Sequence, residues 1–321
     1  MIHKGIFSRL VCCAWLLAIA LVADRVPGQV RGPLVDIDGD LVADAPTEPE
    51  QWIDPDTLIF AYTPVEDPSI YRGVWREFIE HLEKATGKKV QFFMVQSNAA
   101  QLEAMRAGRL HVAGFNTGST PIAVNLCGFV PFAMMAASDG SYGYEMEIIV
   151  PAGSEIQSIQ DLKGRQIAFT SPTSNSGYKA PSVLLRDEFE MEEGRDFTAV
   201  FSGKHDNSIL GVAHGDYEAA AIANSVMHRM IGREVVSEDA FRTIYKSETF
   251  PTTAYGYVYN LHPDLAEKIR GAFFSFDWNG TALQKEFAPQ GQTQFIPISY
   301  KETWALVRRI DQLMGVEYQI E

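Results

Sequence analysis

The sequence predicts an α/β protein with two lobes that are joined by two connecting segments. From Thr57 onward, short β-prone runs alternate with helical runs, which is typical of sheets covered by helices on both faces. A turn-forming break at 140–143 separates a first alternating series from a second one. A further strand beginning at Tyr255 and two late helices return the chain to the first lobe. The length of 321 residues is sufficient for two ordinary domains.

The N-terminus has the form of an export signal. Lys4 and Arg9 precede an apolar run at 11–23, and this run of thirteen residues is short for a membrane span. We therefore expect residues 1–23 to be a signal peptide and the protein to be periplasmic or otherwise extracytoplasmic, with an uncleaved anchor as the alternative. Because the other two cysteines lie in this run, we expect Cys127 to be a buried thiol rather than part of a disulfide.

Residues 24–56 are rich in Pro, Gly and Asp and lack periodicity, which predicts an acidic linker. Within this linker, alternating acids resemble a calcium-binding loop, namely Asp36, Asp38, Asp40 and Asp44. However, Leu41 occupies the position where such a loop needs Gly, and Thr47 occupies the position of its Glu. A solvated linker is the simpler interpretation, and calcium binding stays an open alternative.

The first lobe is predicted to consist of residues 57–140 and 255–321. Its expected strands cover 57–63, 89–95, 110–115, 129–137 and 255–260, and its expected helices cover 69–86, 98–106, 121–126, 263–276 and 300–314. Ligands of such sheets lie beyond the carboxyl ends of the strands. Here those ends carry Tyr62 and the segment 115–119, so we expect Tyr62 and Phe115 to wall a binding site.

The second lobe is predicted to consist of residues 141–254. Its expected strands cover 144–150, 166–170, 197–202, 218–223 and 242–247, and its helical segments cover 159–163, 176–190, 205–214 and 226–231. The chain is expected to cross between the lobes near 138–145 and 247–255. Two lobes joined in this way leave a cleft that can close on a small ligand by a hinge motion.

The segment from Gly164 to Pro181 carries the strongest functional signal. A short strand at 166–170 is followed by small polar residues and then by a helix that begins near Ser176. Free backbone N–H groups and the positive end of the helix dipole would point into this turn. Ser174 and Asn175 add side-chain donors beside Ser176, an arrangement that suits a tetrahedral oxyanion such as phosphate. An ordinary helix cap is the alternative, since Ser and Asn are favoured at such positions for local reasons.

His205 is the second functional signal, because it lies between a predicted strand and a helix, where a His facing a cleft can donate to an anion. Tyr178 is expected to join Tyr62 and Phe115 as an aromatic wall of the site, with packing in the core as the alternative for each of the three. The sequence contains no evident catalytic constellation and no cofactor-binding motif, so we expect neither an enzyme nor a cofactor. The net charge of −14 argues against nucleic acid and anionic membrane surfaces as partners.

Over residues 57–318, the chain resembles the phosphonate-, phosphite- and phosphate-binding proteins of ABC importers. The most specific matches are Asp139-Gly140 with Gly143-Tyr144, the turn 174–178 with Pro181, the segment 203–206, and Trp304. The resemblance implies a two-lobed fold like that of periplasmic binding proteins, with two mixed sheets flanked by helices and a two-segment hinge. It also implies a receptor that captures a phosphorus oxyanion and delivers it to a membrane permease, and we expect this receptor to be a monomer.

The resemblance further implies the residues that contact the ligand. The oxyanion-binding turn of the family corresponds to Ser174, Ser176, Gly177 and Tyr178, with Asn175 in place of the family's Thr. The family's His corresponds to His205, and its two strand-end aromatic residues correspond to Tyr62 and Phe115.

Members of the family that bind aminoalkyl phosphonates hold the ammonium group with two acids. The corresponding stretches here, 223–225 and 251–254, contain no acid. An ammonium group buried without a partner is costly, so the sequence favours phosphite, phosphate or a small amine-free phosphonate. The alternatives are a receptor for another small anion, a sensor partner of a membrane kinase, and an enzyme acting on a phosphorylated small molecule.

Overall fold

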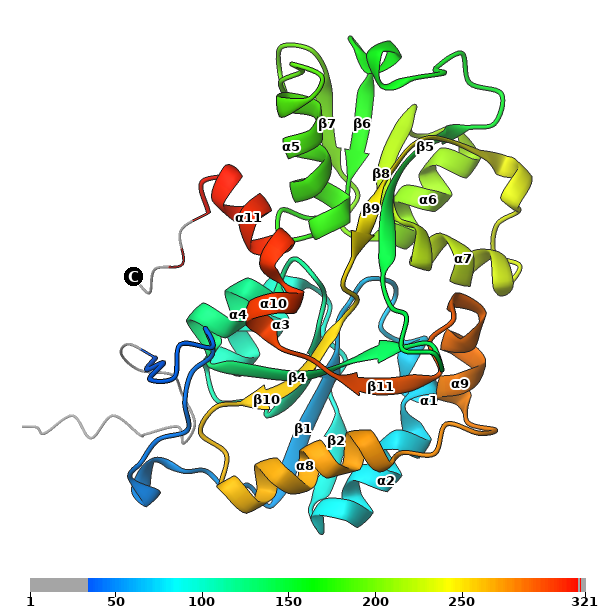
Figure 1. Ribbon diagram of the computed structural model, residues 1–321. Helices are drawn as coiled ribbons and strands as arrows, with labels where there is room; N and C mark the ends of the chain where they lie inside the picture. The colour runs from blue at the N-terminus through cyan, green and yellow to red at the C-terminus, as the bar shows by residue number, and fades with distance from the viewer. Residues whose placement is uncertain (1–33, 317, 319–321) are drawn as a thin grey trace, which may run out of the picture.

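The structure, a computed structural model, describes residues 34–316 and residue 318. The predicted signal peptide lies outside the described residues. The ribbon consists of two lobes, one above the other in the view of Figure 1, and each lobe is built around one sheet. Both sheets contain parallel and antiparallel pairs, which confirms the predicted mixed α/β architecture.

The sheet of the first lobe has six strands in the order β11-β4-β10-β3-β1-β2. Strand β1 pairs in parallel with β2 and β3, whereas β10 runs antiparallel to β3 and β4. The strands are β1 (Thr57–Tyr62), β2 (Lys89–Phe92), β3 (Val112–Phe115), β4 (Phe129–Ala136), β10 (Ala254–Val258) and β11 (Gln294–Pro297). All residues of β3 and β10 are buried, as expected for central strands that are covered on both faces.

The sheet of the second lobe has five strands in the order β7-β6-β8-β5-β9. Strand β6 pairs in parallel with β7 and β8, and β5 runs antiparallel to β8 and β9. The strands are β5 (Tyr144–Pro151), β6 (Gln166–Phe169), β7 (Thr198–Phe201), β8 (Ala219–Ala223) and β9 (Phe241–Phe250). The chain passes from one sheet to the other between β4 and β5 and again between β9 and β10.

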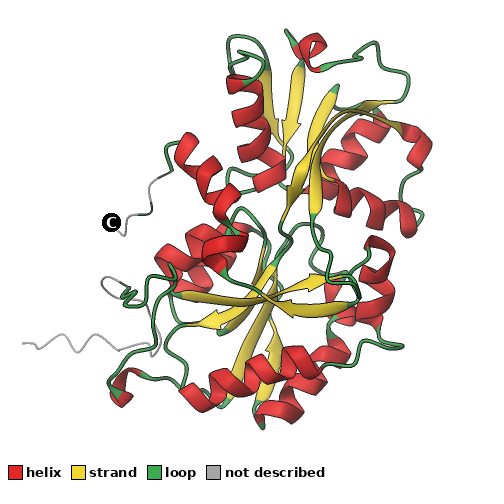
Figure 2. Cartoon of the chain, viewed as in Figure 1, coloured by secondary structure: helices red, strands yellow, loops and turns green. Residues whose placement is uncertain are grey.

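Helices flank both sheets (Figure 2). Those between the strands of the first sheet are α1 (Tyr71–Val74), α2 (Arg76–Thr86), α3 (Asn98–Arg106), α4 (Thr120–Cys127), α8 (Pro263–Ser275) and α9 (Ala282–Phe287). Those of the second lobe are α5 (Ala180–Asp187), α6 (His205–His214) and α7 (Asn224–Gly232). The chain then ends with α10 (Tyr300–Thr303) and α11 (Ala305–Leu313).

The structure differs from the expected elements in three places. The helix expected at 176–190 begins with a π-helical turn, Asn175–Lys179, and ends at Asp187. The helix α9 and the strand β11 were not predicted, because segments of six and four residues are too short to show a period. The last helix, expected in the first lobe, also packs against α5 and the π-helical turn of the second lobe, as Figure 1 shows.

An aromatic cluster holds the first lobe together. The rings of Phe60, Trp75, Phe78, Tyr255 and Phe273 are all fully or almost fully buried. Phe78 and Phe273 lie with their ring centroids 4.6 Å apart, and Trp75 lies 5.5 Å from Tyr255. Aromatic pairs at such distances add to the stabilisation from area burial. The cluster therefore gives the strands that lead to the binding region a rigid base.

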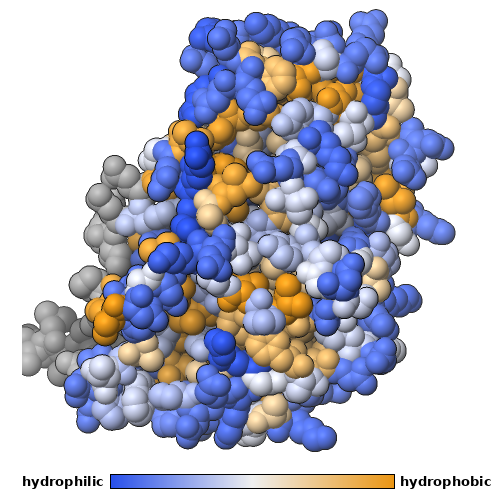
Figure 3. Space-filling view, viewed as in Figure 1, coloured by the Kyte–Doolittle hydropathy of each residue, from blue (hydrophilic) through white to orange (hydrophobic). Residues whose placement is uncertain are grey.

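The surface visible in Figure 3 is mainly polar on both lobes, with smaller apolar groups between the polar side chains. Within the described residues, no helix combines the length and the apolar character needed to cross a membrane. Cys127 is buried, as predicted, and forms no disulfide with another described residue; burial raises the pKa of its thiol to about 12.

The described part of the predicted linker lies against the first lobe. Ile53 forms a bridge with Leu261, and Lys301 Nζ donates to the carbonyl oxygen of Gly39. The carboxylates of Asp36, Asp38 and Asp40 lie within 4.8 Å of one another and are exposed. They accept backbone N–H groups of their own loop, as in Gly39 N to Asp36 Oδ1 at 2.8 Å. Calcium binding by this loop stays an untested prediction.

Candidate functional site

A cavity of about 50 Å³ lies where the two lobes meet, and residues of both lobes line it. The first lobe and its connecting segment contribute Tyr62, Val65, Asn116, Thr117, Thr252, Thr253, Tyr255 and Gln292. The second lobe contributes Tyr144, Ser174, Asn175, Ser176, His205, Ala223, Ser225, Val226 and Arg229. Five of the residues predicted from the sequence are therefore brought together here: Tyr62, Ser174, Asn175, Ser176 and His205.

The turn before α5 presents polar groups to this cavity. Ser174 caps the π-helical turn, and its Oγ accepts the backbone N–H of Gly177 at 3.0 Å. The N–H groups of Asn175 and Ser176 precede the first hydrogen bond of the turn, so the turn itself does not use them. These two N–H groups and the Ser176 hydroxyl supply donors at the positive end of the following helix.

Gly177 does not line the cavity but allows the turn to pack tightly. A Cβ at this position would lie 2.0 Å from Thr170 Oγ1 and 2.8 Å from Ser174 Oγ. A side chain at this position would therefore displace Thr170 or Ser174, so Gly177 shapes the turn, and its role as a ligand contact stays a prediction.

His205 is held as a neutral hydrogen-bond donor. It begins α6, and its Nδ1 accepts the backbone N–H of Ala223 at 3.1 Å. Burial is the main cause that lowers the pKa of His205, to about 4. A neutral imidazole that accepts at Nδ1 carries its proton at Nε2. This Nε2 lies 3.3 Å from Ser174 Oγ. Ser174 Oγ therefore accepts hydrogen bonds from His205 Nε2 and from the Gly177 N–H, and its own hydroxyl hydrogen is available to a ligand.

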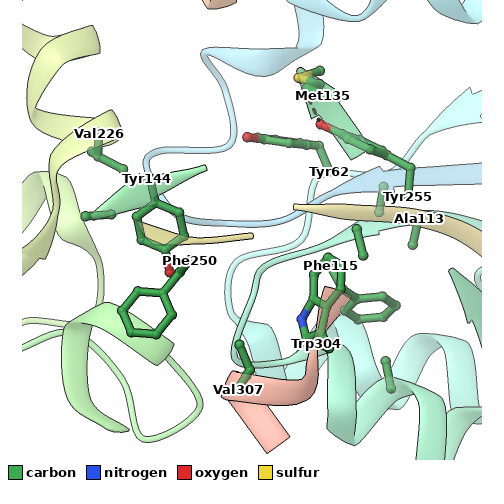
Figure 4. Packing of buried hydrophobic residues seen from close by; sticks show 14 of the residues in the cluster. Tyr62, Ala113, Phe115, Met135, Tyr144, Val226, Phe250, Tyr255, Trp304 and Val307 are labelled. Atoms are coloured by element: carbon green, nitrogen blue, oxygen red, sulfur yellow. Dashed lines mark hydrogen bonds between the residues drawn. The ribbon is translucent and has the colours of Figure 1, made fainter. Parts of the chain in front are cut away.

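Two tyrosines face the cavity from opposite lobes. Tyr62 ends β1 of the first lobe and Tyr144 begins β5 of the second. Figure 4 shows the Tyr62 hydroxyl pointing away from the first sheet toward the side on which Tyr144 and Val226 lie. Burial raises the pKa of Tyr62 to about 12 and also raises that of Tyr144, so both hydroxyls keep their protons at neutral pH. Asn175 Nδ2 donates to the Tyr144 hydroxyl at 3.3 Å.

Arg229 is the only formally charged side chain among the described residues that line the cavity. It is paired with Glu66 of the opposite lobe, with Nε 3.0 Å and Nη2 2.9 Å from Glu66 Oε2. Arg233 also contacts Glu66, and Glu286 lies 3.1 Å from Arg233 Nη1. We call these four residues the Glu66 cluster. Burial acts to lower the pKa of Arg229, but the neighbouring Tyr71 and Glu66 together with Tyr62 and Glu286 outweigh it and raise the pKa.

Two of the predicted site residues lie elsewhere. Phe115 is fully enclosed in the first lobe and packs against Phe129 at a centroid distance of 4.8 Å. The polar residues that follow it, Asn116 and Thr117, line the cavity instead. Tyr178 packs on Phe169 and Phe201. It lies two residues beyond Ser176, and a helical turn places residues two apart on opposite faces.

The lobes are in direct contact beside the cavity. Lys179 Nζ, from the π-helical turn, donates to Gly118 O at 2.9 Å and to Asp311 Oδ1 of α11 at 2.7 Å. A Cβ on Gly118 would lie 2.3 Å from Thr173 O and 2.5 Å from Asn175 N, both in the backbone of the other lobe. The ligand-facing turn is therefore pressed against the loop after β3.

The sequence missed several lining residues. Tyr144, Thr252 and Thr253 lie in or beside the segments that connect the lobes. The family resemblance includes their stretches, but no pattern in the sequence identified them as lining residues. Ala223 and Ser225 follow β8, whose carboxyl end approaches His205. A search of polar residues at every strand end would have found Asn116, Thr117 and Ser225.

Comparisons with known proteins agree on the kind of protein. The family model described as "ABC transporter, phosphonate, periplasmic substrate-binding protein" matches residues 60–304. The chain is 26% identical over 263 residues to the phosphate-import protein PhnD of Mycolicibacterium smegmatis, covering 79% of this chain and 81% of that protein. It is 25% identical to the phosphonates-binding periplasmic protein of Escherichia coli, covering 68% of this chain and 66% of that protein.

Solved structures share the fold. The binding protein component of an ABC phosphonate transporter from Pseudomonas aeruginosa has a TM-score of 0.73 at 20% identity, over 82% of this chain and 87% of that one. PhnD1 from Prochlorococcus marinus, solved in complex with methylphosphonate, has a TM-score of 0.71 at 16% identity, over 82% of this chain and all of that one (100%). Because the family model covers most of its length, the chain belongs to the periplasmic substrate-binding proteins of phosphonate ABC transporters, which implies an extracytoplasmic location, a small-molecule ligand and a membrane permease as partner.

Proposed function

We propose that this protein captures phosphate, phosphite or a small amine-free phosphonate in the cavity between its lobes and passes it to the permease of an ABC importer. The observation that carries the proposal is the convergence of neutral donors on one small cavity. These are the hydroxyls of Ser174 and Ser176 and the N–H groups at the start of the π-helical turn, while Nε2 of His205 donates to Ser174 Oγ and so leaves the Ser174 hydroxyl hydrogen for the ligand. Oriented donors of this kind hold an oxyanion strongly where water is excluded.

The size of the cavity favours a ligand of a few heavy atoms. Its volume of about 50 Å³ is less than twice the roughly 30 Å³ that one water occupies in the liquid. Phosphate, phosphite and methylphosphonate have four or five heavy atoms. The Prochlorococcus relative is solved with methylphosphonate and the Mycolicibacterium relative imports phosphate, which supports the same class of ligand for this chain.

One buried acceptor favours an oxyanion that carries a proton. Asn175 Oδ1 has no hydrogen-bond partner among the described residues, and Asn175 lines the cavity. A buried acceptor without a partner is costly, and a P–OH group would satisfy it. Hydrogen phosphate and monoprotonated phosphonates have such a group at neutral pH, whereas sulfate has none. We therefore expect phosphate or methylphosphonate to bind more tightly than sulfate.

The lining also supports a ligand without an amine. Residues 223, 225, 252 and 253, from the two stretches in which the resemblance implies acids in aminoalkyl-phosphonate binders, line the cavity as Ala, Ser, Thr and Thr. No carboxylate stands among the described lining residues. An ammonium group in the closed cavity would thus lack an anionic partner.

Calorimetric titration of the protein with phosphate, phosphite, methylphosphonate, 2-aminoethylphosphonate and sulfate tests the proposal. We expect one amine-free phosphorus anion to bind best and its affinity to fall at least about tenfold in Ser174→Ala and in Ser176→Ala, since each removes a charge-assisted hydrogen bond. Ser182→Ala is the matched control, because its Oγ donates to Tyr178 O and does not line the cavity. Tightest binding of sulfate or of 2-aminoethylphosphonate, or an equal effect of all three serines, would contradict the proposal.

A further inference from the structure

We propose that Arg229 is a specificity-determining residue that excludes ligands with a cationic tail from the cavity. The proposal rests on the function proposed above and names the side chain that sets one part of its selectivity. Missing acids leave a cationic tail without a partner, but a fixed guanidinium in the wall would also repel it. The two effects are separable by experiment.

Arg229 lies on α7 and forms part of the cavity wall. It lies one helical turn after Ser225 and Val226, which also line the cavity, so the three share one face of the helix. Val65 and Tyr62 form the wall on the side of the first lobe. The Arg229 side chain is only 4% exposed, and little water is available to screen its charge.

The guanidinium cannot turn away from the cavity without breaking buried ion pairs. Both its Nε and its Nη2 contact Glu66 Oε2, at 3.0 and 2.9 Å, and Glu286 Oε1 lies 3.8 Å from Nε. Its other face lies over the ring of Phe287, 5.6 Å from the centroid. Rotation would leave Arg229 or Glu66 buried with fewer partners, which is strongly unfavourable.

The orientation of the Glu66 cluster decides which charge the ligand meets. The cluster contains two acids and two arginines, but only Arg229 lines the cavity, while Glu66, Arg233 and Glu286 do not. A tail group next to Arg229 therefore meets the cationic member of a pair that is neutral as a whole. Two like charges a few ångströms apart at a partly desolvated site repel by enough to reduce affinity about tenfold or more.

Two ligands of equal size isolate the charge of the tail. Ethylphosphonate and aminomethylphosphonate have the same number of heavy atoms, and an ammonium group replaces a methyl group. In the unaltered protein we expect ethylphosphonate to bind more tightly. In Arg229→Gln we expect the ratio of the two dissociation constants to move at least about tenfold toward aminomethylphosphonate, because the repulsion is gone and Glu66 keeps Arg233 as its partner.

Arg233→Gln is the matched control. It also removes one guanidinium from Glu66 but none from the cavity wall. We expect it to leave the ratio within about twofold of the original, and any loss of fold stability cancels in the ratio. Arg229→Lys, which retains the charge, should keep the original ratio even if both ligands bind more weakly.

Three results would overturn the inference. If Arg229→Gln lowered the affinity for both ligands equally, Arg229 would contact the phosphonate group itself. If Arg229→Lys also shifted the ratio of the two dissociation constants toward aminomethylphosphonate, the shape of the Arg229 side chain rather than its charge would determine the selectivity. Tighter binding of aminomethylphosphonate to the unaltered protein would contradict the inference without any variant, so it stays testable if a variant does not fold. Failure of the proposed function looks different, because then neither ligand nor phosphate would bind the unaltered protein.

Discussion

The cavity and the Glu66 cluster are neighbouring buried regions that share one residue, Arg229, yet they use polarity in opposite ways. Apart from Arg229, the polar groups that line the cavity are hydroxyls, amides and a neutral imidazole. The cluster consists of four ionised groups, and Glu66 at its centre is fully buried. Both regions join the two lobes, so their difference concerns chemistry rather than location.

The cluster can bury charges because its partners are always present. Glu66 contacts Arg229, Arg233 and the Tyr71 hydroxyl, and these arginines outweigh its burial and lower the pKa of its carboxyl. The cavity has to stay stable when its ligand is absent. A cation placed there without a partner would be costly, whereas neutral donors and a helix dipole are not. A binding site built from dipoles therefore separates ligand recognition from fold stability.

Breaking the cluster tests the stability side of this comparison and should have the largest effect. We expect Glu66→Ala to lower the free energy of unfolding by about 3–5 kcal/mol, because it leaves buried arginines with too few partners. Urea denaturation measures this loss. Glu103→Ala, which removes a surface ion pair to Arg106, is the control and should change little. A Ser174→Ala variant that is destabilised as much as Glu66→Ala would contradict the separation of the two roles.

Disturbing the contact between the lobes tests the recognition side. In Gly118→Ala the new methyl group would meet the backbone of Thr173 and Asn175 at about the distances given above, and neither can move independently of its lobe. We expect the affinity for phosphate or methylphosphonate to fall on the order of 100-fold, while each lobe stays folded. Titration measures the affinity and circular dichroism the fold. Gly73→Ala, where a Cβ meets no atom within 4 Å, should bind normally.

The buried histidines predict how stability depends on pH. Burial lowers the pKa values of His205 and His111 to about 4 from the ordinary 6.5. Below pH 6.5 the unfolded chain binds protons that the folded chain does not, so stability falls as the pH drops from about 6.5 to 4. The full loss for His205 is roughly 3 kcal/mol. Thermal melts should show a shallower acid dependence in His205→Asn, and an unchanged dependence would contradict the neutral imidazole.

Substitution of Asn175 should have the smallest effect, and it tests how the site distinguishes phosphate from sulfate. Asn175→Ala removes the unpaired acceptor of the cavity. We expect phosphate to lose about fivefold in affinity, which corresponds to one hydrogen bond, and sulfate to change less. Competition titrations of the two anions measure this difference. If the affinities for phosphate and sulfate fell equally, Asn175 would stabilise the turn rather than accept a hydrogen bond from the protonated ligand.

The parts of the site that local sequence could predict are those with local causes. Ser174 and Ser176 lie in a strand–turn–helix unit whose small residues and helix start are visible in a stretch of eighteen residues. His205 begins a helix in the same way. The aromatic residues were predicted less well, because a position near the end of an element does not say which face its side chain takes. Phe115 faces the core and Tyr178 faces Phe169 and Phe201.

Other features depend on contacts between distant segments. Glu66 and Arg229 are 163 residues apart, and neither lies in a recognisable motif. Tyr144 reaches the cavity because β5 pairs with β8 and β9, and the register of an antiparallel strand follows from its partners. The strand β11 has only four residues and pairs only with β4. Such features appear only when the fold places the segments together.

A crystal structure of the protein with methylphosphonate tests the central claim most directly. The account predicts that the three phosphonate oxygens lie within about 3 Å of Ser174 Oγ, Ser176 Oγ or the N–H groups of Asn175 and Ser176. It also predicts that the ion pair between Arg229 and Glu66 stays intact. A phosphonate bound by the guanidinium of Arg229, with Glu66 released, would contradict the account, because the site would then be charged rather than dipolar.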